Sequence, residues 1–309
     1  MKIESNKIYG VMYHYVHNNG INNYKFNRLK ISEFKNQIRF FKTNFNILNY
    51  QDFSEILLTR KFPKKPSIIL SFDDAYKDHI ENVFSILKKE KLKGFFYPPT
   101  NIFDNKLLDV NKIQIILSTN PNLKKIIDFT KKNLKEEFEK IIKKEKDIFK
   151  SRYDNKETTL IKRMYQYAIP GKKRVKLLNL LFNKLIHEDE KILSKKLYLN
   201  KKELINLHNE DMHIGVHGIK HQWLSKVSNT QQIIEINGAR KFYKKLNINS
   251  DSICYPYGAY NKYTLKILKK YKFKFGLTTN LGSINSRNIK NIYTLNRYDA
   301  NDFKNLLWK

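Results

Sequence analysis

The sequence predicts an α/β protein whose parallel strands form a closed or nearly closed barrel, with a helical insertion in the middle of the chain. Short apolar segments alternate with segments of helical periodicity before residue 105 and again after residue 199. Between them lies a stretch rich in Lys, Glu, Leu and Ile that has helical character and no strand pattern. Because strands alternate with helices along the chain, we expect a parallel sheet with crossover helices.

The first part of the chain carries three predicted strands, at residues 8–13, 67–72 and 94–97. Each is a short apolar run, and prolines lie just before the second and just after the third, where they would bound a buried strand. Ser32 is expected to cap one helix. Residues 77–91 are expected to form another helix, because their apolar side chains recur at i, i+3, i+4 and i+7.

Residues 105–199 are expected to form several helices, interrupted at Pro121 and Pro170. Their charge pattern is typical of solvated helix faces, and no catalytic constellation is visible among them. The alternation then resumes, with helix caps expected at Asn200 and Ser228. Further strands are predicted at residues 212–216, 252–255 and 275–279, and a further helix at 263–271. We therefore predict a discontinuous barrel from residues 1–104 and 200–309, with 105–199 as the insertion.

The chain is strongly basic, with a formal net charge of +31, but the charge is a poor guide to its partner. The basic residues are mostly Lys, spread along the whole chain together with abundant Asn, Ile, Tyr and Phe, all residues of A/T-rich codons. Nucleic-acid recognition motifs are absent, so no specific nucleic-acid partner is expected. A positive surface would suit a phosphate-bearing substrate or an anionic membrane face.

The protein is expected to be cytoplasmic, with peripheral contact to the inner face of the membrane as an open alternative. Cys254 is the single cysteine, so an internal disulfide framework is excluded and a reducing compartment is favoured. The N-terminal residues are polar and lack the apolar region of a signal peptide. No apolar run is long enough for a membrane-spanning helix.

Two adjacent carboxylates, Asp73 and Asp74, follow the strand predicted at 67–72. Side chains at the carboxyl end of a parallel strand project into the mouth of the sheet, where ligands bind. Because like charges repel, burying both carboxylates favours a cation beside them. One would bind the metal while its neighbour stays free as a base. The alternative is an Asp pair that caps the next helix with help from its dipole.

Two histidines, His217 and His221, follow the strand predicted at 212–216. The three-residue spacing places both imidazoles on one side of a helical turn or tight loop, which suits a metal ion. This pattern alone is weak. It becomes informative beside a separate carboxylate that completes a set of two histidines and one Asp. The neighbouring His208 and His213 are interpreted as structural or surface residues.

A third cluster, Cys254 to Gly258, follows the strand predicted at 252–255. Pro256 and Gly258 favour a sharp turn that could aim backbone N–H groups into a pocket. A plain turn between a strand and a helix explains the same residues.

In this order, the three clusters resemble the motifs of the polysaccharide deacetylase family, which contains the NodB homology domain. The resemblance covers about residues 8–104 and 200–302 and leaves the helical segment outside it. It implies a distorted (β/α)7-type barrel. It also implies hydrolysis of N-acetyl groups, in some members N-formyl groups, from amino sugars.

The resemblance assigns roles to residues by position. It makes Asp73 the catalytic base. Tyr257 matches the residue whose backbone N–H helps to stabilise the oxyanion, and with Pro256 it is expected to contact the substrate. The metal ligands that the resemblance implies are Asp74, His217 and His221.

The sequence departs from the family pattern at three positions. Ala75 replaces a Gly and Gly218 replaces a Ser or Thr, which are mild changes. Cys254 replaces the Arg that orients the catalytic Asp, which is serious. Arg297, at a neighbouring strand end, is the candidate replacement.

The family's late general-acid His also has no counterpart after His221. A permuted subgroup carries this His near the N-terminus in a Tyr-His-x-Val context. Residues 13–16 here read Tyr-His-Tyr-Val, so the resemblance makes His14 the general acid. The alternative for His14 is a core histidine at a strand end.

We therefore expect a divalent metal ion, Zn²⁺ by default, with Co²⁺, Ni²⁺ or Fe²⁺ also suited to one Asp and two His. The expected substrate is an N-acylated amino sugar, in a nucleotide- or lipid-linked precursor of a surface glycan or in a polysaccharide. Three rival functions stay open. They are a catalytically inactive carbohydrate-binding homologue, a non-haem Fe(II) oxygenase, and a nucleic-acid-binding protein suggested by charge alone.

Overall fold

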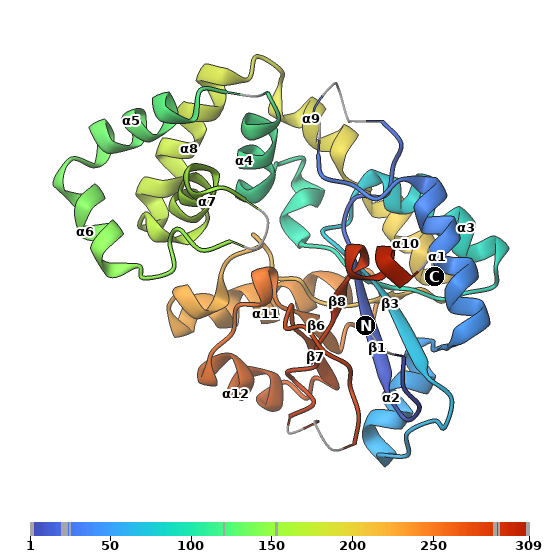
Figure 1. The fold of residues 1–309 in the computed structure, drawn as a ribbon. Helices are drawn as coiled ribbons and strands as arrows, with labels where there is room; N and C mark the ends of the chain where they lie inside the picture. The colour runs from blue at the N-terminus through green and yellow to red at the C-terminus, as the bar shows by residue number, and fades with distance from the viewer. Residues whose placement is uncertain are drawn as a thin grey trace.

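The computed structural model describes residues 3–19, 24, 26–119, 121–151, 154–286, 289 and 291–306 (Figure 1). The strands in this part of the chain are β1 (Ile8–Tyr13), β2 (Asn46–Ile47), β3 (Ser67–Asp73), β4 (Phe95–Tyr97), β5 (His213–Ile214), β6 (Ser252–Cys254), β7 (Phe275–Leu277) and β8 (Tyr298–Asp299). The helices outside the insertion are α1 (Ile31–Asn44), α2 (Tyr50–Thr59), α3 (Ser85–Lys89), α10 (Lys201–Asn209), α11 (Asn229–Lys244) and α12 (Lys262–Lys270).

The strands pair in parallel around the molecule. One sheet has the order β5-β4-β3-β1-β8, with β2 also on β3, and a second sheet pairs β6 with β7. Single parallel bridges, Val216 to Ile253 and Leu277 to Leu295, link the second sheet to β5 and to the segment entering β8. These bridges complete a cyclic order of neighbours, although the continuous ladders alone do not close. The α/β class and the parallel sheet predicted from the sequence are confirmed.

Strand β3 is the centre of the fold because all seven of its residues are buried. Its run of Ile68, Ile69 and Leu70 is typical of a parallel strand covered on both faces. The register places Tyr13 beside Phe72, and Asp73 beside Tyr97. The carboxyl ends of β1, β3 and β4 therefore meet at one edge, and the loops that follow them share one end of the molecule.

Several elements differ in detail from the sequence-based expectation. The helix expected at 77–91 is a π-helical segment, His79–Phe84, followed by the short helix α3. Helix α1 begins at Ile31, so Ser32 lies inside it and is not its cap. Helix α2 and strand β2 were not predicted, whereas β8 corresponds to the strand end that was expected at Arg297. The caps at Asn200 and Ser228 are confirmed, because each side chain accepts a hydrogen bond from the backbone N–H three residues later.

Between β4 and β5 the chain forms the helices α4 (Asp109–Ser118), α5 (Leu123–Leu134), α6 (Glu136–Lys144), α7 (Lys156–Arg163), α8 (Gly171–Leu185) and α9 (Glu190–Leu197). Figure 1 shows α4 to α8 gathered in one group beside the strands. Each helix buries an apolar stripe and exposes charged residues, as the sequence pattern indicates.

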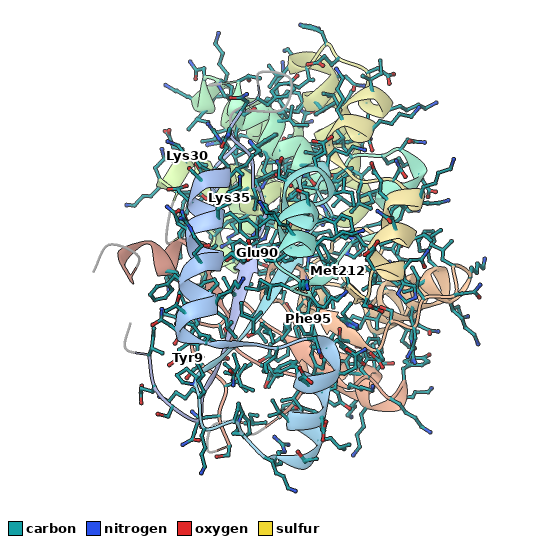
Figure 2. All side chains as sticks on the ribbon, turned by 90° about the vertical axis from the view of Figure 1, so that its right-hand side faces the viewer. Tyr9, Lys30, Lys35, Glu90, Phe95 and Met212 are labelled. Carbon is teal, nitrogen blue, oxygen red and sulfur yellow. The ribbon has the colours of Figure 1, made fainter. Side chains whose placement is uncertain are left out.

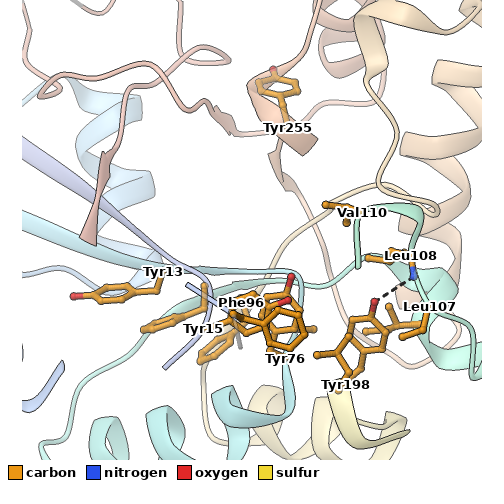
Figure 3. Packing of buried hydrophobic residues seen from close by; sticks show 14 of the residues in the cluster. Tyr13, Tyr15, Tyr76, Phe96, Leu107, Leu108, Val110, Tyr198 and Tyr255 are labelled. Atoms are coloured by element: carbon orange, nitrogen blue, oxygen red, sulfur yellow. Dashed lines mark hydrogen bonds between the residues drawn. The ribbon is translucent and has the colours of Figure 1, made fainter. Parts of the chain in front are cut away.

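A buried polar and aromatic cluster joins the insertion to the strand ends (Figure 3). The rings of Tyr15 and Tyr76 stack with centroids 3.9 Å apart. The Asn111 side chain, on α4, donates to both of their hydroxyls, at 3.0 and 2.9 Å, and accepts a 2.5 Å hydrogen bond from Tyr198. Leu108 N–H in turn donates to the Tyr198 hydroxyl at 3.2 Å, the dashed line in Figure 3. Because Asn111 is fully buried, these bonds fix α4 against the mouth of the barrel.

Figure 2 shows many nitrogen-tipped side chains around the outline of the molecule in that view. Lys30, which precedes α1, and Lys35, on α1, are two of the basic residues in this view. Among the described residues, no helix has the length and apolar character needed to cross a bilayer.

Candidate active site

A cavity of about 210 Å³ lies where the strands end. Its walls include residues that follow five different strands, namely His14, Asp73, Asp74, His217, His221, Tyr255, Tyr257 and Thr279. The structure thus brings together six of the eight site residues predicted from the sequence. The other two do not line the cavity: Pro256 lies between the lining residues Tyr255 and Tyr257, and Arg297 contacts Asp73. Larger cavities of about 530 and 650 Å³ occur elsewhere, but no described histidine lines either of them.

Asp74, His217 and His221 form a buried cluster of three possible metal ligands. Asp74 Oδ1 lies 3.4 Å from Nε2 of His217 and 3.2 Å from Nε2 of His221. No described residue donates a hydrogen bond to this oxygen, whereas Oδ2 accepts one from the Tyr76 hydroxyl at 2.9 Å. An unpartnered buried oxygen facing two imidazole nitrogens is the donor set of a divalent-metal site, so these residues fit such an ion.

The histidine tautomer also suits a metal. His217 Nδ1 is 2.7 Å from the backbone oxygen of Cys254, so Nδ1 carries the proton and donates it there. This leaves Nε2 free to face Asp74 and the cavity, as in metal-binding histidines oriented by a carbonyl. Gly218 and His221 have φ values of 75° and 54°, so the loop between the two histidines turns in the left-handed region.

The electrostatics of this cluster depend on close opposite charges. Burial acts to raise the pKa of Asp74, but His221 and His217 outweigh burial and hold it well below its ordinary value. Burial lowers the pKa of His221. The pKa of His217 is raised despite burial, because it contacts Cys254 and Asp74. The cluster therefore keeps Asp74 ionised at neutral pH.

The Asp73 carboxylate pairs with the guanidinium of Arg297, a residue near the C-terminal end of the chain. Arg297 donates to both of its oxygens, at 3.0 Å from Nη1 and 2.8 Å from Nη2. The guanidinium is fixed in turn by Ser71 Oγ and the Thr278 carbonyl, both at 2.9 Å. Burial opposes ionisation, but Arg297 lowers the pKa of Asp73 to about 2, so this carboxylate is charged. Bidentate pairing of this kind fixes orientation as well as charge.

Cys254 lies against the same guanidinium. Its Sγ is 2.9 Å from Arg297 Nη2 and 3.3 Å from Asp73 Oδ2. Arg297, which precedes β8, thus places its guanidinium beside Cys254, the last residue of β6. Asp73, His217 and Cys254 also lie close enough to hold an ion. We favour the Asp74 set, because both Asp73 oxygens already accept hydrogen bonds and burial raises the pKa of the Cys254 thiol.

His14 follows β1 and lines the same cavity as Asp73 and Asp74. Its backbone oxygen accepts a 2.5 Å hydrogen bond from His79 Nε2, which lies in the π-helical segment below. The side chain is partly exposed, and the residue lies at the mouth and not at the far end of the barrel.

The turn after β6 builds an aromatic wall. Tyr257, at φ 59°, packs edge-on against His221 with ring centroids 4.6 Å apart and stacks on Trp223 at 4.9 Å. Gly258, at φ 67°, is required here, because a Cβ atom would lie 2.2 Å from Thr279 Oγ1. The sharp turn that Pro256 and Gly258 favour is therefore present, and Tyr257 within it lines the cavity.

Sequence reasoning missed part of the site. The insertion contributes five residues to the cavity wall, which are Val110, Ile113, Gln114, Lys162 and Gln166. Trp223 was also overlooked, although it follows His221 by only two residues. A Trp directly after a metal-ligand motif was a usable signal. The insertion residues gave none, because their place depends on how α4 and α7 dock.

Comparison with known protein families gives one match. Residues 173–276 match the family model of polysaccharide deacetylases. The matched segment contains His217, His221 and Tyr257, begins inside the insertion at α8, and leaves Asp73 and Arg297 outside. No curated protein sequence matches the chain.

Several solved structures resemble the whole chain. Deacetylase PplD from Streptococcus pyogenes, in complex with acetate, has a TM-score of 0.61 at 19% identity, over 96% of this chain and 92% of that one. IcaB from Ammonifex degensii has a TM-score of 0.58 at 12% identity, over 96% and 93%. A de-N-acetylase from Aggregatibacter actinomycetemcomitans has a TM-score of 0.57 at 11% identity, over 95% and 95%. The resemblance inferred from the sequence is confirmed: residues 173–276 match the polysaccharide deacetylase model, and the fold of the chain resembles that of solved polysaccharide deacetylases.

Proposed function

We propose that this protein is a metal-dependent carbohydrate deacetylase, which hydrolyses an N-acetyl group of an amino sugar. The observation that carries the proposal is the buried Asp74 Oδ1, which receives no hydrogen bond from any described residue and faces two imidazole nitrogens beside the ionised Asp73. The family match and the shared fold support the same reaction class. The acetate in the Streptococcus pyogenes structure is the acid that removal of an acetyl group releases.

Asp74, His217 and His221 would hold the cation. Zn²⁺ is the proposed ion, and Co²⁺, Ni²⁺ or Fe²⁺ suit the same donors. Such an ion polarises the amide carbonyl and makes a water molecule more acidic. The His217 hydrogen bond to the Cys254 carbonyl fixes the ring that would bind it.

The protein's own residues would move the protons. Asp73, ionised and oriented by Arg297, takes a proton from the attacking water. The backbone N–H of Tyr257 would stabilise the negative charge that develops on the amide oxygen. His14 donates a proton to the leaving nitrogen as the C–N bond breaks. The products are acetate and the free amine, so one water is consumed for each bond broken.

The substrate side of the proposal rests on the aromatic wall and on charge. Trp223 and Tyr257 form a flat apolar surface next to the ligand cluster, and Pro256 shapes the turn that presents it. Sugar rings stack on such surfaces. We further propose that the substrate is a nucleotide- or lipid-linked precursor of a surface glycan. The protein would then act in the cytoplasm, at an anionic membrane face, where its net charge of +31 favours contact.

The proposed roles of Asp73 and Asp74 can be tested by replacing each carboxylate in turn. In Asp73→Asn, we expect acetate release from an N-acetylglucosamine oligosaccharide to fall by more than a thousandfold, with about one divalent ion per chain retained. In Asp74→Asn, His217→Ala and His221→Ala, both the ion and the activity should be lost.

Elemental analysis of each purified variant, together with acetate release, distinguishes these results. Equal metal loss from Asp73→Asn and Asp74→Asn would overturn the division of roles. A metal-loaded wild-type protein that releases no acetate from neutral, nucleotide-linked or lipid-linked substrates would instead support the inactive binding homologue.

A further inference from the structure

A second cavity, of about 570 Å³, lies beside the active-site cavity and carries no assigned role. It is formed by the start of α4, the start of α8 and the loop around His221. Cations outnumber carboxylates among its lining residues, with Lys106, Lys112, Lys172, Arg174 and Lys220 against Asp109 and Glu190.

Two of these cations have partners. Lys112 is closely paired, because its Nζ lies 2.9 Å from Glu190 Oε2 and 2.8 Å from Asn179 Oδ1. Arg174 is 6% exposed, yet its Nε has no described hydrogen-bond acceptor, and Asp109 Oδ2 is 3.6 Å away. Burial also raises the pKa of Asp109, which weakens this pairing further.

The other three cations, Lys106, Lys172 and Lys220, form no ion pair with any described residue. The cavity therefore holds excess positive charge and a buried donor without an acceptor. Buried donors in folded proteins are normally satisfied, so the unsatisfied Nε of Arg174, a residue that lines this cationic cavity, indicates a missing anionic partner.

The N-terminus of α8 adds backbone donors at the same place. The helix begins at Gly171, has 15 residues, and is preceded by Pro170, which provides no side-chain cap. Nothing lies within 4 Å of the position of a Cβ atom on Gly171, so the first turn is open to a ligand. The unpaired N–H groups and the dipole of a helix start favour phosphate-like anions. Arg174 lies in this first turn, next to those groups.

The second cavity adjoins the active site through shared elements. Lys220 and Gln222 flank His221, and Asp109 precedes Val110, which lines the active-site cavity. Gln222 Oε1 is buried without a described donor, so it can accept a hydrogen bond from a hydroxyl group.

We propose that this cavity binds a phosphate group carried by the substrate, while the sugar to be deacetylated lies at Asp73 and Asp74. The inference rests on the proposed function for the identity of the substrate, and on the second cavity alone for the phosphate. It identifies the substrate as a phosphorylated glycan and distinguishes it from a neutral polymer.

A binding experiment tests the phosphate site independently of catalysis. Lys106→Gln/Lys172→Gln removes two exposed cations from the cavity, and Lys176→Gln/Lys184→Gln removes two exposed cations elsewhere on the insertion. Both variants lower the net charge equally and leave Asp74, His217 and His221 intact. In calorimetric titrations of the metal-loaded proteins with inorganic pyrophosphate, we expect affinity to fall about tenfold or more in the first variant and less than about twofold in the second.

Arg174→Lys adds a variant that keeps the charge but loses the planar fork, and it should also weaken pyrophosphate binding severalfold. If pyrophosphate bound at the metal instead, its affinity would not distinguish the variants in the second cavity from the control variant. Equal affinities in both double variants, or no measurable binding to the wild type, would overturn the proposal.

A kinetic experiment separates a substrate phosphate from a free anion. For acetate release from an N-acetylglucosamine trisaccharide and from its 1-diphosphate, the Lys106→Gln/Lys172→Gln variant should raise KM about tenfold for the diphosphate only. An unchanged KM with weakened pyrophosphate binding would mean that the cavity holds only free anions, which overturns the substrate assignment. If neither compound is deacetylated, the proposed function fails, while the calorimetric comparison still decides the phosphate site.

Discussion

The barrel mouth and the helical insertion both place charged residues beside the active site, but they treat them differently. At the mouth, Asp73 receives two hydrogen bonds from Arg297, whose guanidinium is held by two further acceptors. In the insertion, Arg174 faces a cavity with a 3.6 Å ion pair and an unsatisfied Nε. Both arginines are buried, so exposure does not explain the contrast. A saturated charge is suited to holding a reacting group in place, whereas an unsaturated one is suited to receiving a ligand.

The largest expected difference is between removal of these two arginines. Arg297→Ala leaves Asp73 buried without its cation, and we expect the free energy of unfolding to fall by about 3–5 kcal/mol. Arg174→Ala should cost less, about 1–2 kcal/mol, because its described ion pair with Asp109 is loose, at 3.6 Å. Denaturant unfolding of both variants checks this. Similar losses would show that the two sites do not differ in charge compensation.

The next largest effect is expected from the Asn111 hydrogen bonds, which join the insertion to the strand ends. Asn111→Ala removes hydrogen bonds to Tyr15, Tyr76 and Tyr198 in a buried cluster, and should cost about 2–4 kcal/mol. Because α4 contributes to the cavity wall, KM for acetate release should also rise severalfold. Asn133→Ala, on an exposed helix face, is the control and should leave both quantities unchanged. A stable Asn111→Ala protein with wild-type KM would mean that the insertion is not anchored here.

Asp78 is an exception at the mouth, because burial raises its pKa to about 7 and its Oδ1 has no described donor. In the unfolded chain this carboxyl titrates near 3.9. Between these values the folded protein binds more protons, so stability falls as pH rises from about 4 to about 7. Asp78→Asn keeps an acceptor for Val16 N–H and should raise stability at pH 8 by about 2 kcal/mol, with no gain at pH 4. Thermal unfolding at the two pH values measures this, and a gain at pH 4 would refute the titration.

The smallest expected effect concerns backbone strain. Asp74 and Ala75 have φ values of 70° and 56°, and an L-residue in this region costs about 1 kcal/mol. Ala75→Gly should therefore raise stability by no more than about 0.6 kcal/mol, which is the strain relieved less the added entropy of the unfolded chain. Ala259→Gly, with an ordinary φ of −87°, should instead be destabilising. A destabilised Ala75→Gly would show that the methyl group packs usefully.

Local patterns predicted the parts of the site that lie at strand ends. Asp74, His217 and His221 were found because parallel strands bring their carboxyl ends together, so short motifs far apart in sequence converge. Arg297 was found by asking which neighbouring strand end could replace the residue at Cys254. This succeeded because β8 lies beside β1.

The parts that the sequence did not predict depend on packing between distant elements. Strand β2 has two residues and therefore no periodicity to recognise. Val110, Ile113 and Gln114 line the cavity because Asn111 and its tyrosine partners fix α4, and no local pattern encodes that docking. Helix α2 was recoverable, because Asn49 caps it by accepting from Asp52 N–H.

The pairing of Arg297 with Asp73 also has a consequence for how the chain folds. These residues are separated by 224 positions. A chain that has collapsed around β1, β3 and β4 still lacks the guanidinium, so Asp73 must stay hydrated or take up a proton. Docking of β8 beside β1 removes that penalty in the same step that completes the parallel order. Contacts over such sequence separations form slowly, so the reactive carboxylate is charge-compensated only when the barrel is assembled. A partly folded chain in which β8 is not yet docked should therefore have no deacetylase activity, because Asp73 gains its Arg297 partner only when β8 pairs with β1.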